Sequence, residues 1–548
     1  PALLTTVAVT WIGAFLLLSP MQMRDFNSSA FAALFSIANL QFYLESGYFA
    51  ALASTKPLLH TWSLSVEEQF YLVWPLLLAV MSRFLPRIGV PIAIALICAA
   101  SLWVGLTWTR GDAALAFYML PSRAIELGIG ALLVWLPALP NRWLLNAATV
   151  AGAVAMIVPM IIYTERTPFP GWAVLLPCAG AALFIIGAKS EAAAPFRLAP
   201  VAWVGRISYS LYLVHWPVIV LYTAYFYRPL EGLDPWLLMT VSVGLAWAQY
   251  HFVEQRFRRP AVAPKRNWPV VTGTLAAAFI VAGISGAVAL TGGLDWRVPA
   301  HRQTQSEDAR DARGCGSNNP ALDRRLFSCQ NYREKDRDLF VWGDSHGLHL
   351  AVGLAAAYPD RNIYVLHRSG CVPQSGFGGF VHEISSEQTN RECVERNRRA
   401  FEFFTNGEPH DLIMTSAKRG TPELIAEITV PMVEDLEAAG NTVVFLGDFI
   451  RPGWNLVDCA TVPDYLISDA WRAARCVGVP RVARTELSYN KRLSELVPAF
   501  VSINEVQCPG GACQFFENER ILFRDDDHLN DRGSVLMVGR LKPLLPFN

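Results

Sequence analysis

The first half of the chain alternates long apolar runs with short polar segments. A helix needs about 17 to 25 mostly apolar residues to cross a bilayer. Nine runs meet this criterion without interruption, and a further run at 28–43 is interrupted by Asn39 and Gln41. This further run is either a tenth span or a helix lying in the interface. The pattern predicts a multi-span helical membrane domain over residues 1–291, with nine or ten spans. The nine uninterrupted runs cover residues 3–19, 67–84, 89–107, 118–136, 146–163, 171–187, 207–226, 235–252 and 268–291.

The pattern changes near residue 292. A polar stretch at 292–337 is expected to be a linker, and short apolar runs then alternate with amphipathic ones over 338–548. Strands that alternate with helices predict a parallel sheet flanked by helices, which is an α/β/α domain. The expected strands lie at 339–346, 362–369, 411–416, 442–448 and 500–506.

Composition supports a membrane protein and argues against a nucleic-acid-binding one. The chain is 53% hydrophobic, with a mean hydropathy of +0.29, so part of it belongs in lipid. Lys plus Arg and Asp plus Glu number 46 each, so no excess positive charge is available to neutralise phosphates. The lipid bilayer is therefore an expected partner, and DNA or RNA is not.

Eight of the ten cysteines lie in the polar last part of the chain. Such clustering is typical of an oxidising space outside the cytoplasm, where disulfides persist. No pair has the CxxC spacing of a zinc site, so no metal is expected. Short loop closure favours pairing between neighbours. The expected pairs are 315 with 329, 371 with 393, 459 with 476, and 508 with 513.

The loop charges predict which side of the membrane each loop occupies. If the basic loop at 253–267 is cytoplasmic, the loops on that side hold 11 Lys and Arg residues and the opposite loops hold five. Positively charged loops stay inside. Residues 292–548 are therefore expected outside the cytoplasm, where the cysteines also place them.

A serine and a histidine stand at opposite ends of the expected α/β domain. Gly343-Asp-Ser-His346 follows an apolar strand, where open α/β sheets keep their active sites, and Asp525-Asp-Asp-His-Leu529 lies far downstream. A serine nucleophile needs an imidazole to take its proton and a carboxylate to orient that imidazole. Either motif alone is equally well explained as a helix cap or a solvated acidic loop, but their combination is more specific.

Together the two motifs resemble those of the SGNH hydrolases and acyltransferases. The resemblance implies that Ser345 is the nucleophile, His528 the general base and Asp525 the orienting acid, with Asp526 and Asp527 in variable positions. Gly370 is the candidate for an oxyanion-hole glycine, although a turn glycine beside a disulfide explains it equally well. The family also supplies an asparagine to that hole, but the corresponding TSAKRG at 415–420 contains none.

Ionisable residues at membrane depth are costly and often mark a reaction path. The stretch HTWSLSVEEQFYLVWP at 60–75 and two later segments contain such residues. Each also has a plain structural explanation: Glu67 as an interfacial cap, Arg123 with Glu126 as an ion pair three apart on one helix, and His215 as a core histidine. The candidates are His60, Trp62, Ser63, Glu67, Glu68, Arg123, Glu126 and His215.

The first 291 residues resemble the acyltransferase-3 family. The stretch at 60–75 carries the resemblance, and three later segments agree with it in order: RAIELGIGALL at 123–133, ISYSLYLVHWP at 207–217 and HFVEQRFRRP at 251–260. Joined to an SGNH domain, the chain is similar to the fused O-acetyltransferases that modify lipopolysaccharide O-antigen or peptidoglycan. The resemblance implies acetyl-CoA as the acyl donor on the cytoplasmic side, no bound cofactor, and a cell-surface glycan as acceptor. It also implies a place in the bacterial inner membrane, with the C-terminal domain in the periplasm.

One family feature lies outside this sequence. Members carry a basic residue and an essential histidine in their first span, and the sequence begins after that region, so about two more spans are expected before Pro1.

Two rival functions remain open. One is a tethered carbohydrate esterase or deacetylase, which would need only one span, and the other is a transporter or sensor, which leaves Ser345, Asp525 and His528 unexplained.

Overall fold

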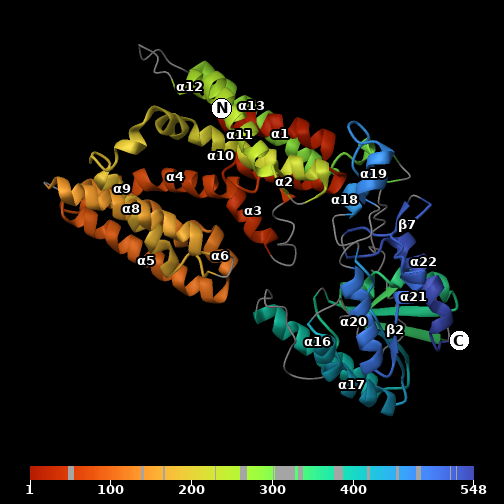
Figure 1. The fold of residues 1–548 in the computed structure, drawn as a ribbon. Helices are drawn as coiled ribbons and strands as arrows, with labels where there is room; N and C mark the ends of the chain where they lie inside the picture. The colour runs from red at the N-terminus through yellow and green to blue at the C-terminus, as the bar shows by residue number, and fades with distance from the viewer. Residues whose placement is uncertain are drawn as a thin grey trace. The chain divides into compact units, whose positions relative to one another are not determined.

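The chain divides into two compact units, Pro1–Leu294 and Asp295–Asn548, and each is described here by itself (Figure 1). The computed structural model describes residues 1–46, 55–136, 141–164, 167–228, 230–258, 268–299, 302, 327–330, 337–368, 370–374, 387–415, 420–451, 456–476, 483–518, 520–525 and 527–547.

The described part of the first unit is helical. A π-helical turn at Tyr250–Glu254 joins α11 to α12. The helices are α1 (Ala2–Leu17), α2 (Pro20–Leu34), α3 (Ala38–Glu45), α4 (Thr61–Phe84), α5 (Gly89–Gly111), α6 (Ala113–Tyr118), α7 (Leu120–Leu132), α8 (Arg142–Ile162), α9 (Leu175–Gly187), α10 (Ala199–Phe226), α11 (Asp234–Gln249), α12 (Gln255–Arg258) and α13 (Trp268–Leu290).

All nine apolar runs of the sequence lie on helices, which confirms the predicted membrane fold class. Within the described residues, six helical segments are long and apolar enough to cross a bilayer. Three runs lie on shorter helices, because α1 and α11 have 16 residues each and α9 has 13. The six long segments are Thr61–Phe84, Gly89–Gly111, Ala113–Trp135, Arg142–Ile162, Ala199–Phe226 and Val271–Leu290.

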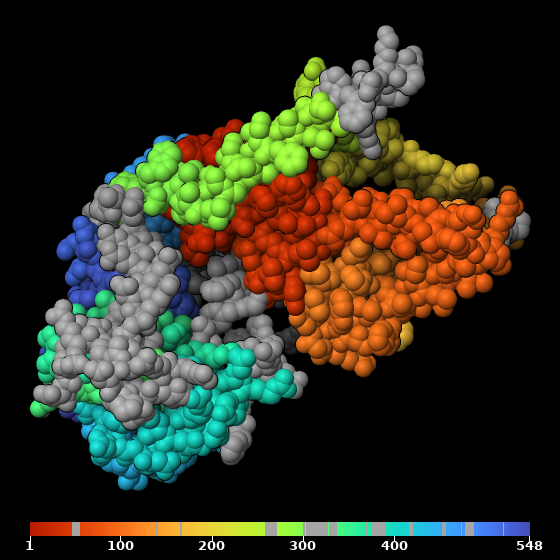
Figure 2. Space-filling model, turned by 180° about the vertical axis from the view of Figure 1, so that it is seen from behind, coloured from red at the N-terminus to blue at the C-terminus, as the bar shows by residue number. Residues whose placement is uncertain are grey.

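The interrupted run at 28–43 forms two helices instead of one span. α2 ends at Leu34, Ser36 has a positive φ of 57°, and α3 begins at Ala38. The polar residues that interrupt the run bind other parts of the protein: Asn39 Nδ2 donates to the carbonyl of Tyr118 at 3.1 Å. α2 packs along α13, although more than 200 residues separate them in the sequence (Figure 2).

A six-stranded sheet forms the centre of the second unit, in the order β1-β3-β2-β4-β5-β6. β1 is antiparallel to β3 and the other pairings are parallel. Four of the predicted strands are present, the fifth is only the two residues of β6 because the helix α21 begins at Asn504, and the predicted fold class is confirmed. β1 and a small hairpin of β7 and β8 are additional. The strands are β1 (Ser328–Gln330), β2 (Arg337–Gly343), β3 (Arg361–His367), β4 (Asp411–Thr415), β5 (Thr442–Leu446), β6 (Phe500–Val501), β7 (Phe516–Glu517) and β8 (Arg520–Ile521).

Helices cover both faces of this sheet. Phe340 and Trp342 of β2 point into a core built with α16, α17 and α20, whereas the alternate residues Leu339 and Val341 are buried on the other face. α15 and α22 pack against each other, and α15 contacts β3. The helices are α14 (Ser345–Leu348), α15 (Ala351–Ala357), α16 (Glu387–Asn406), α17 (Pro422–Ala438), α18 (Leu456–Ala460), α19 (Asp469–Cys476), α20 (Ala483–Leu496), α21 (Asn504–Gln507) and α22 (Asp531–Leu541).

The register aligns the carboxyl ends of the four central strands. Gly343 at the end of β2 pairs with His367 of β3 and with Thr415 of β4, and Thr415 pairs with Leu446 of β5. A Cβ on Gly343 would lie 2.7 Å from the carbonyl oxygen of Thr415, so only glycine fits there. The segments that follow these strands therefore meet at one edge of the sheet.

Disulfides join neighbouring cysteines of the second unit, as short loop closure predicted. Cys371 pairs with Cys393, Cys459 with Cys476, and Cys508 with Cys513. The expected partner of Cys329, which is Cys315, lies outside the described residues.

Candidate active site

Ser345 begins α14 directly after β2. Asp344 caps this short helix, because its side chain accepts a hydrogen bond of 2.9 Å from the backbone N–H of His346. Ser345 is 9% exposed, so it lies at the margin of the buried carboxyl edge. This placement agrees with the sequence-based expectation of a serine on a strand-to-helix turn.

The loop that contains His528 is held closed at its base. Phe523 and Leu529 form an antiparallel bridge, and the N–H of Arg524 donates to the carbonyl of His528 at 2.9 Å. The next residue, Asn530, caps α22 by accepting a hydrogen bond from Gly533 N. The acidic loop is therefore a fixed turn; Asp526 within it lies outside the described residues.

The structure brings Asp525 and His528 together. His528 Nδ1 lies 2.9 and 3.0 Å from the two carboxylate oxygens of Asp525. His528 Nε2 is buried and has no hydrogen-bond partner among the described residues. The ring of His346, the residue after Ser345, lies 4.9 Å from the ring of His528, so the serine and histidine motifs meet at one site.

Three residues to which the sequence assigned no role complete the cluster. His346 Nδ1 lies 2.7 Å from Asp448 Oδ1, and His346 Nε2 lies 3.6 Å from Asp527 Oδ2. The other oxygen of Asp527 lies 2.7 Å from His528 Nδ1. Sequence reasoning could have placed Asp448, because it is the last residue of the predicted strand at 442–448 and that strand ends at the same sheet edge as the strand before Ser345.

Burial and neighbouring charges act in opposite directions on the pKa values of this cluster. Burial by itself would lower the pKa of His346, but Asp448, with help from Asp527 and Asp344, raises that pKa to about 10, so the imidazole is cationic at neutral pH. Burial opposes ionisation of Asp527, yet its contacts with His346 and His528 hold its pKa well below the usual value.

Opposing effects also act on the predicted base. Burial would lower the pKa of His528, the carboxylates of Asp525 and Asp527 beside its Nδ1 raise that pKa above the usual value, and the nearby charge of His346 lowers it again. His349 behaves differently: burial lowers its pKa well below the usual value, and its Nδ1 accepts a hydrogen bond of 3.3 Å from Leu529 N. His349 is therefore a neutral support for the loop.

Metal binding offers a second explanation of the same cluster. Donor atoms of His346, Asp527 and His528 lie within 4.8 Å of one another, a spacing that a metal ion also uses. Direct charge pairing accounts for the same contacts, since His346 stands between the carboxylates of Asp448 and Asp527.

Gly370 lies just beyond β3 at the same edge. Its φ of +76° and the hydrogen bond of 3.0 Å from Cys371 N to Arg368 O place it in a tight turn, beside the disulfide to Cys393. A turn requirement is thus sufficient to explain this glycine, and its role as an oxyanion donor stays a prediction. Residues 416–419, where the family's asparagine would stand, lie outside the described residues.

In the membrane unit, three of the predicted residues lie together around Tyr212. The rings of His60 and His215 are 5.6 Å apart, and His215 Nδ1 lies 2.7 Å from the carbonyl oxygen of Tyr212. The Tyr212 hydroxyl lies 2.5 Å from Ser63 Oγ and also donates to the carbonyl of His60. Both ring nitrogens of His60 are buried without a hydrogen-bond partner in the described part of the chain.

A second group contains Trp62, Arg123 and Glu126. Arg123 Nε lies 2.9 Å from Glu126 Oε1, which is the ion pair that the spacing predicted. The guanidinium also lies 5.3 Å from the ring of Trp62. Glu68 is exposed and accepts a hydrogen bond from Ser36, and Glu67 is half-buried on the same helix. No hydrogen bond or ion pair among the described residues joins either of them to the residues of these two groups.

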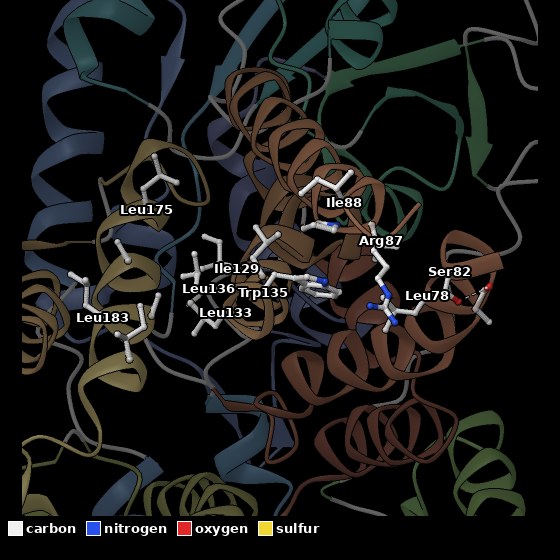
Figure 3. Close-up of a pocket in the computed structure, with 17 residues that line it drawn as sticks. Leu78, Ser82, Arg87, Ile88, Ile129, Leu133, Trp135, Leu136, Leu175 and Leu183 are labelled. Carbon is white, nitrogen blue, oxygen red and sulfur yellow. Dashed lines mark hydrogen bonds between the residues drawn. The ribbon is translucent and has the colours of Figure 1, made fainter. Parts of the chain in front are cut away.

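Cavities open in the described part of the membrane unit. His215 and Tyr212 line a mostly apolar one of about 510 Å³. A larger one, of about 1600 Å³, contains none of the predicted site residues. Figure 3 shows Leu175 and Leu183 of α9 on one side of the larger cavity and Ser82 and Arg87 on the other. Its lining is almost wholly apolar, as expected for a surface that faces lipid acyl chains.

Comparisons with known proteins agree with this two-part architecture. A family model described as an acyltransferase domain matches residues 3–282, and one described as an SGNH domain (fused to AT3 domains) matches residues 314–543. The putative membrane-bound transacylase BcsY of Komagataeibacter xylinus is 30% identical over 53% of this chain and 73% of its own length.

Two O-acetyltransferases are also similar. Peptidoglycan O-acetyltransferase OatA of Listeria monocytogenes is 29% identical over 37% of this chain, and O-acetyltransferase OatA of Staphylococcus aureus is 25% identical over 56% of it. The chain spans 36% and 54% of their lengths. The periplasmic domain of a lipopolysaccharide acetyltransferase from Salmonella serovar Paratyphi A is a solved structure with 16% identity and a TM-score of 0.31, covering 39% of this chain and 84% of its own.

Proposed function

This chain belongs to the acyltransferase family whose domain occupies residues 3–282, here with an SGNH domain at 314–543, and from that premise we propose that it O-acetylates a bacterial cell-surface glycan. The observation that carries the proposal is the hydrogen-bonded pair of His528 and Asp525 at the sheet edge where Ser345 stands. A membrane acyltransferase domain can supply the acyl group, and this edge can transfer it.

In the proposed first step, His528 Nε2 takes the proton of Ser345 while Ser345 Oγ attacks the carbonyl carbon of the acyl donor. The tetrahedral intermediate then collapses, the bond to the donor's leaving group breaks, and that group takes the proton back from His528. Asp525 holds Nδ1–H of His528, so Nε2 is the nitrogen that is free to act as base.

In the proposed second step, His528 removes the proton of a glycan hydroxyl, whose oxygen attacks the acyl-serine. Ser345 leaves with the proton, and the glycan carries the new ester. Water in place of the glycan would give hydrolysis, which is the tethered esterase that the sequence left open. Family membership makes this chain an acyltransferase enzyme rather than a transporter or a sensor.

The donor, the acceptor and the location belong to the same proposal. Acetyl-CoA is the donor we expect at the cytoplasmic face, and the His60, Ser63 and His215 group beside an apolar cavity is the candidate path through the membrane unit. O-antigen and peptidoglycan are the acceptors that we propose, and one of the similar proteins is named as a peptidoglycan O-acetyltransferase. The SGNH domain would then lie in the periplasm of an inner-membrane protein.

The test is mass spectrometry of the surface polysaccharides in cells that lack the gene and carry the full-length protein or a variant. We expect acetyl esters to disappear on deletion, to return with the wild type and not to return with Ser345→Ala. Acetylation that rises on deletion would make the enzyme a deacetylase.

The matched control is Ser494→Ala, which removes an exposed hydroxyl from α20 of the same unit. It should restore acetylation fully. Equal restoration by Ser345→Ala and Ser494→Ala would contradict the assignment of Ser345 as nucleophile.

A further inference from the structure

We propose that His346 is a positioning residue, a cationic bridge between Asp448 and Asp527 that balances the acidic surroundings of His528 so that this histidine can act as a base near neutral pH. The inference rests on the proposed function, because it assigns to His346 an effect on the proposed base. His346 is the last residue of the serine motif, but neither motif predicts that it lies between Asp448 and Asp527.

The geometry forms a continuous row of charged and polar groups behind the nucleophile. Asp448 Oδ1 lies 2.7 Å from His346 Nδ1, His346 Nε2 lies 3.6 Å from Asp527 Oδ2, and Asp527 Oδ1 lies 2.7 Å from His528 Nδ1. The side chains of His346 and Asp448 are 1% and 5% exposed, so water screens this row only weakly. Asp448 is held in turn by Arg451 at 3.3 Å.

Removing the bridge should change the chemistry in a definite direction. Two carboxylates contact His528 Nδ1 and stabilise its protonated form, which cannot act as a base. The cation at His346 opposes them, since its ring lies 4.9 Å away. Without that cation the pKa of His528 rises, and the base becomes neutral only at higher pH. Among the described residues, the titratable and charged groups around these two histidines are Asp344, His349, Asp448, Arg451, Arg524, Asp525 and Asp527.

The experiment follows the reactivity of Ser345 in the full-length protein in membranes. Phenylmethanesulfonyl fluoride sulfonylates an activated serine, and peptide mass spectrometry measures the rate between about pH 5 and pH 9. In His346→Gln the midpoint of the rise in rate should move to higher pH by about one unit or more. Asp527→Asn should move it to lower pH, and the double variant should return it close to the wild-type position.

If His346 had only a structural role, we would not expect the pH midpoint to move in opposite directions in His346→Gln and Asp527→Asn, or to return in the double variant. If His346 only supports the fold, His346→Gln will lower the rate at every pH without moving the midpoint, and the inference fails. His410→Gln is the matched control, because this half-buried histidine precedes β4 at the opposite end of the sheet. It should leave the profile where it is.

Two further outcomes separate the possible failures. A wild-type Ser345 that is not sulfonylated at any pH would contradict the proposed function itself, whereas a normal wild-type profile that His346→Gln does not move would overturn only the role of His346. Loss of reactivity in EDTA that Zn²⁺ restores would assign His346, Asp527 and His528 to a metal ion, and would overturn the charge bridge.

Discussion

At the scale of single residues, Asp525 has two tasks in one side chain. Its Oδ1 accepts hydrogen bonds from the backbone N–H of His528 at 2.7 Å and of Asp527 at 3.2 Å, which fixes the turn. The same carboxylate holds the imidazole of His528. The i, i+3 spacing of the motif therefore places an acid where it both shapes the loop and selects the tautomer of the histidine.

Replacing Asp525 by Ala should remove both tasks. We expect the rate of Ser345 sulfonylation to fall by about 10³-fold to 10⁴-fold, because an imidazole in the wrong tautomer cannot accept the serine proton. The measurement is the same mass-spectrometric rate, taken at neutral pH. Asp360→Asn, an exposed acid at the amino end of β3, is the control and should keep the wild-type rate.

The sequence predicted those site residues that lie close together along the chain. Asp525 and His528 are three residues apart, so a motif reveals them, and the strand before Ser345 fixes its edge. His346 and Asp448 are 102 residues apart, and no spacing rule joins them. Only the parallel register of β2, β4 and β5 brings that pair together.

At the scale of elements, the close approach of β2 and β4 limits what can stand before the nucleophile. Gly343 lies where a Cβ would be 2.7 Å from the carbonyl oxygen of Thr415. Backbone atoms cannot rotate away as a side chain can, so a larger residue must push the strands apart. The glycine of the GDSH motif is thus a packing requirement of the sheet.

Gly343→Ala should therefore destabilise the domain by about 1–3 kcal/mol, which thermal unfolding of the purified protein would measure. Gly539→Ala is a matched control on the exposed side of α22, where a Cβ meets no atom within 4 Å. Because alanine favours a helix interior over glycine, that control should be neutral or slightly stabilising. Equal stability of the two variants would refute the packing argument.

Elements were predictable where burial or lipid demanded a regular pattern. The apolar runs and the central strands satisfy that condition, because each must bury a continuous apolar surface. The run at 28–43 does not bury a continuous apolar surface, since Ser36 has a positive φ and the side chain of Asn39 binds the carbonyl of Tyr118. Strands β7 and β8 have two residues each, which is too short for any alternation to appear.

At the scale of the whole molecule, the proposal requires the cytoplasmic loops of the membrane unit and the SGNH domain to lie on opposite sides of the membrane. The loop containing Arg87 should lie in the cytoplasm, and the SGNH domain outside. An impermeant maleimide tests this placement in cells whose inner membrane is intact. Ser494→Cys on α20 should be labelled at once, and Ser82→Cys near the end of α4 only after permeabilisation; both positions are exposed. The reverse pattern would contradict the topology.

The order of the disulfides along the chain has a consequence for biogenesis. The described bridges close intervals of 22, 17 and 5 residues, and no bridge encloses another. A polypeptide that enters an oxidising compartment from its amino end would expose the two cysteines of each bridge before the next pair arrives, so the first partner available is the native one. Maturation should then depend on a thiol oxidase but not on a disulfide isomerase, and a strain without the isomerase should accumulate the oxidised enzyme normally.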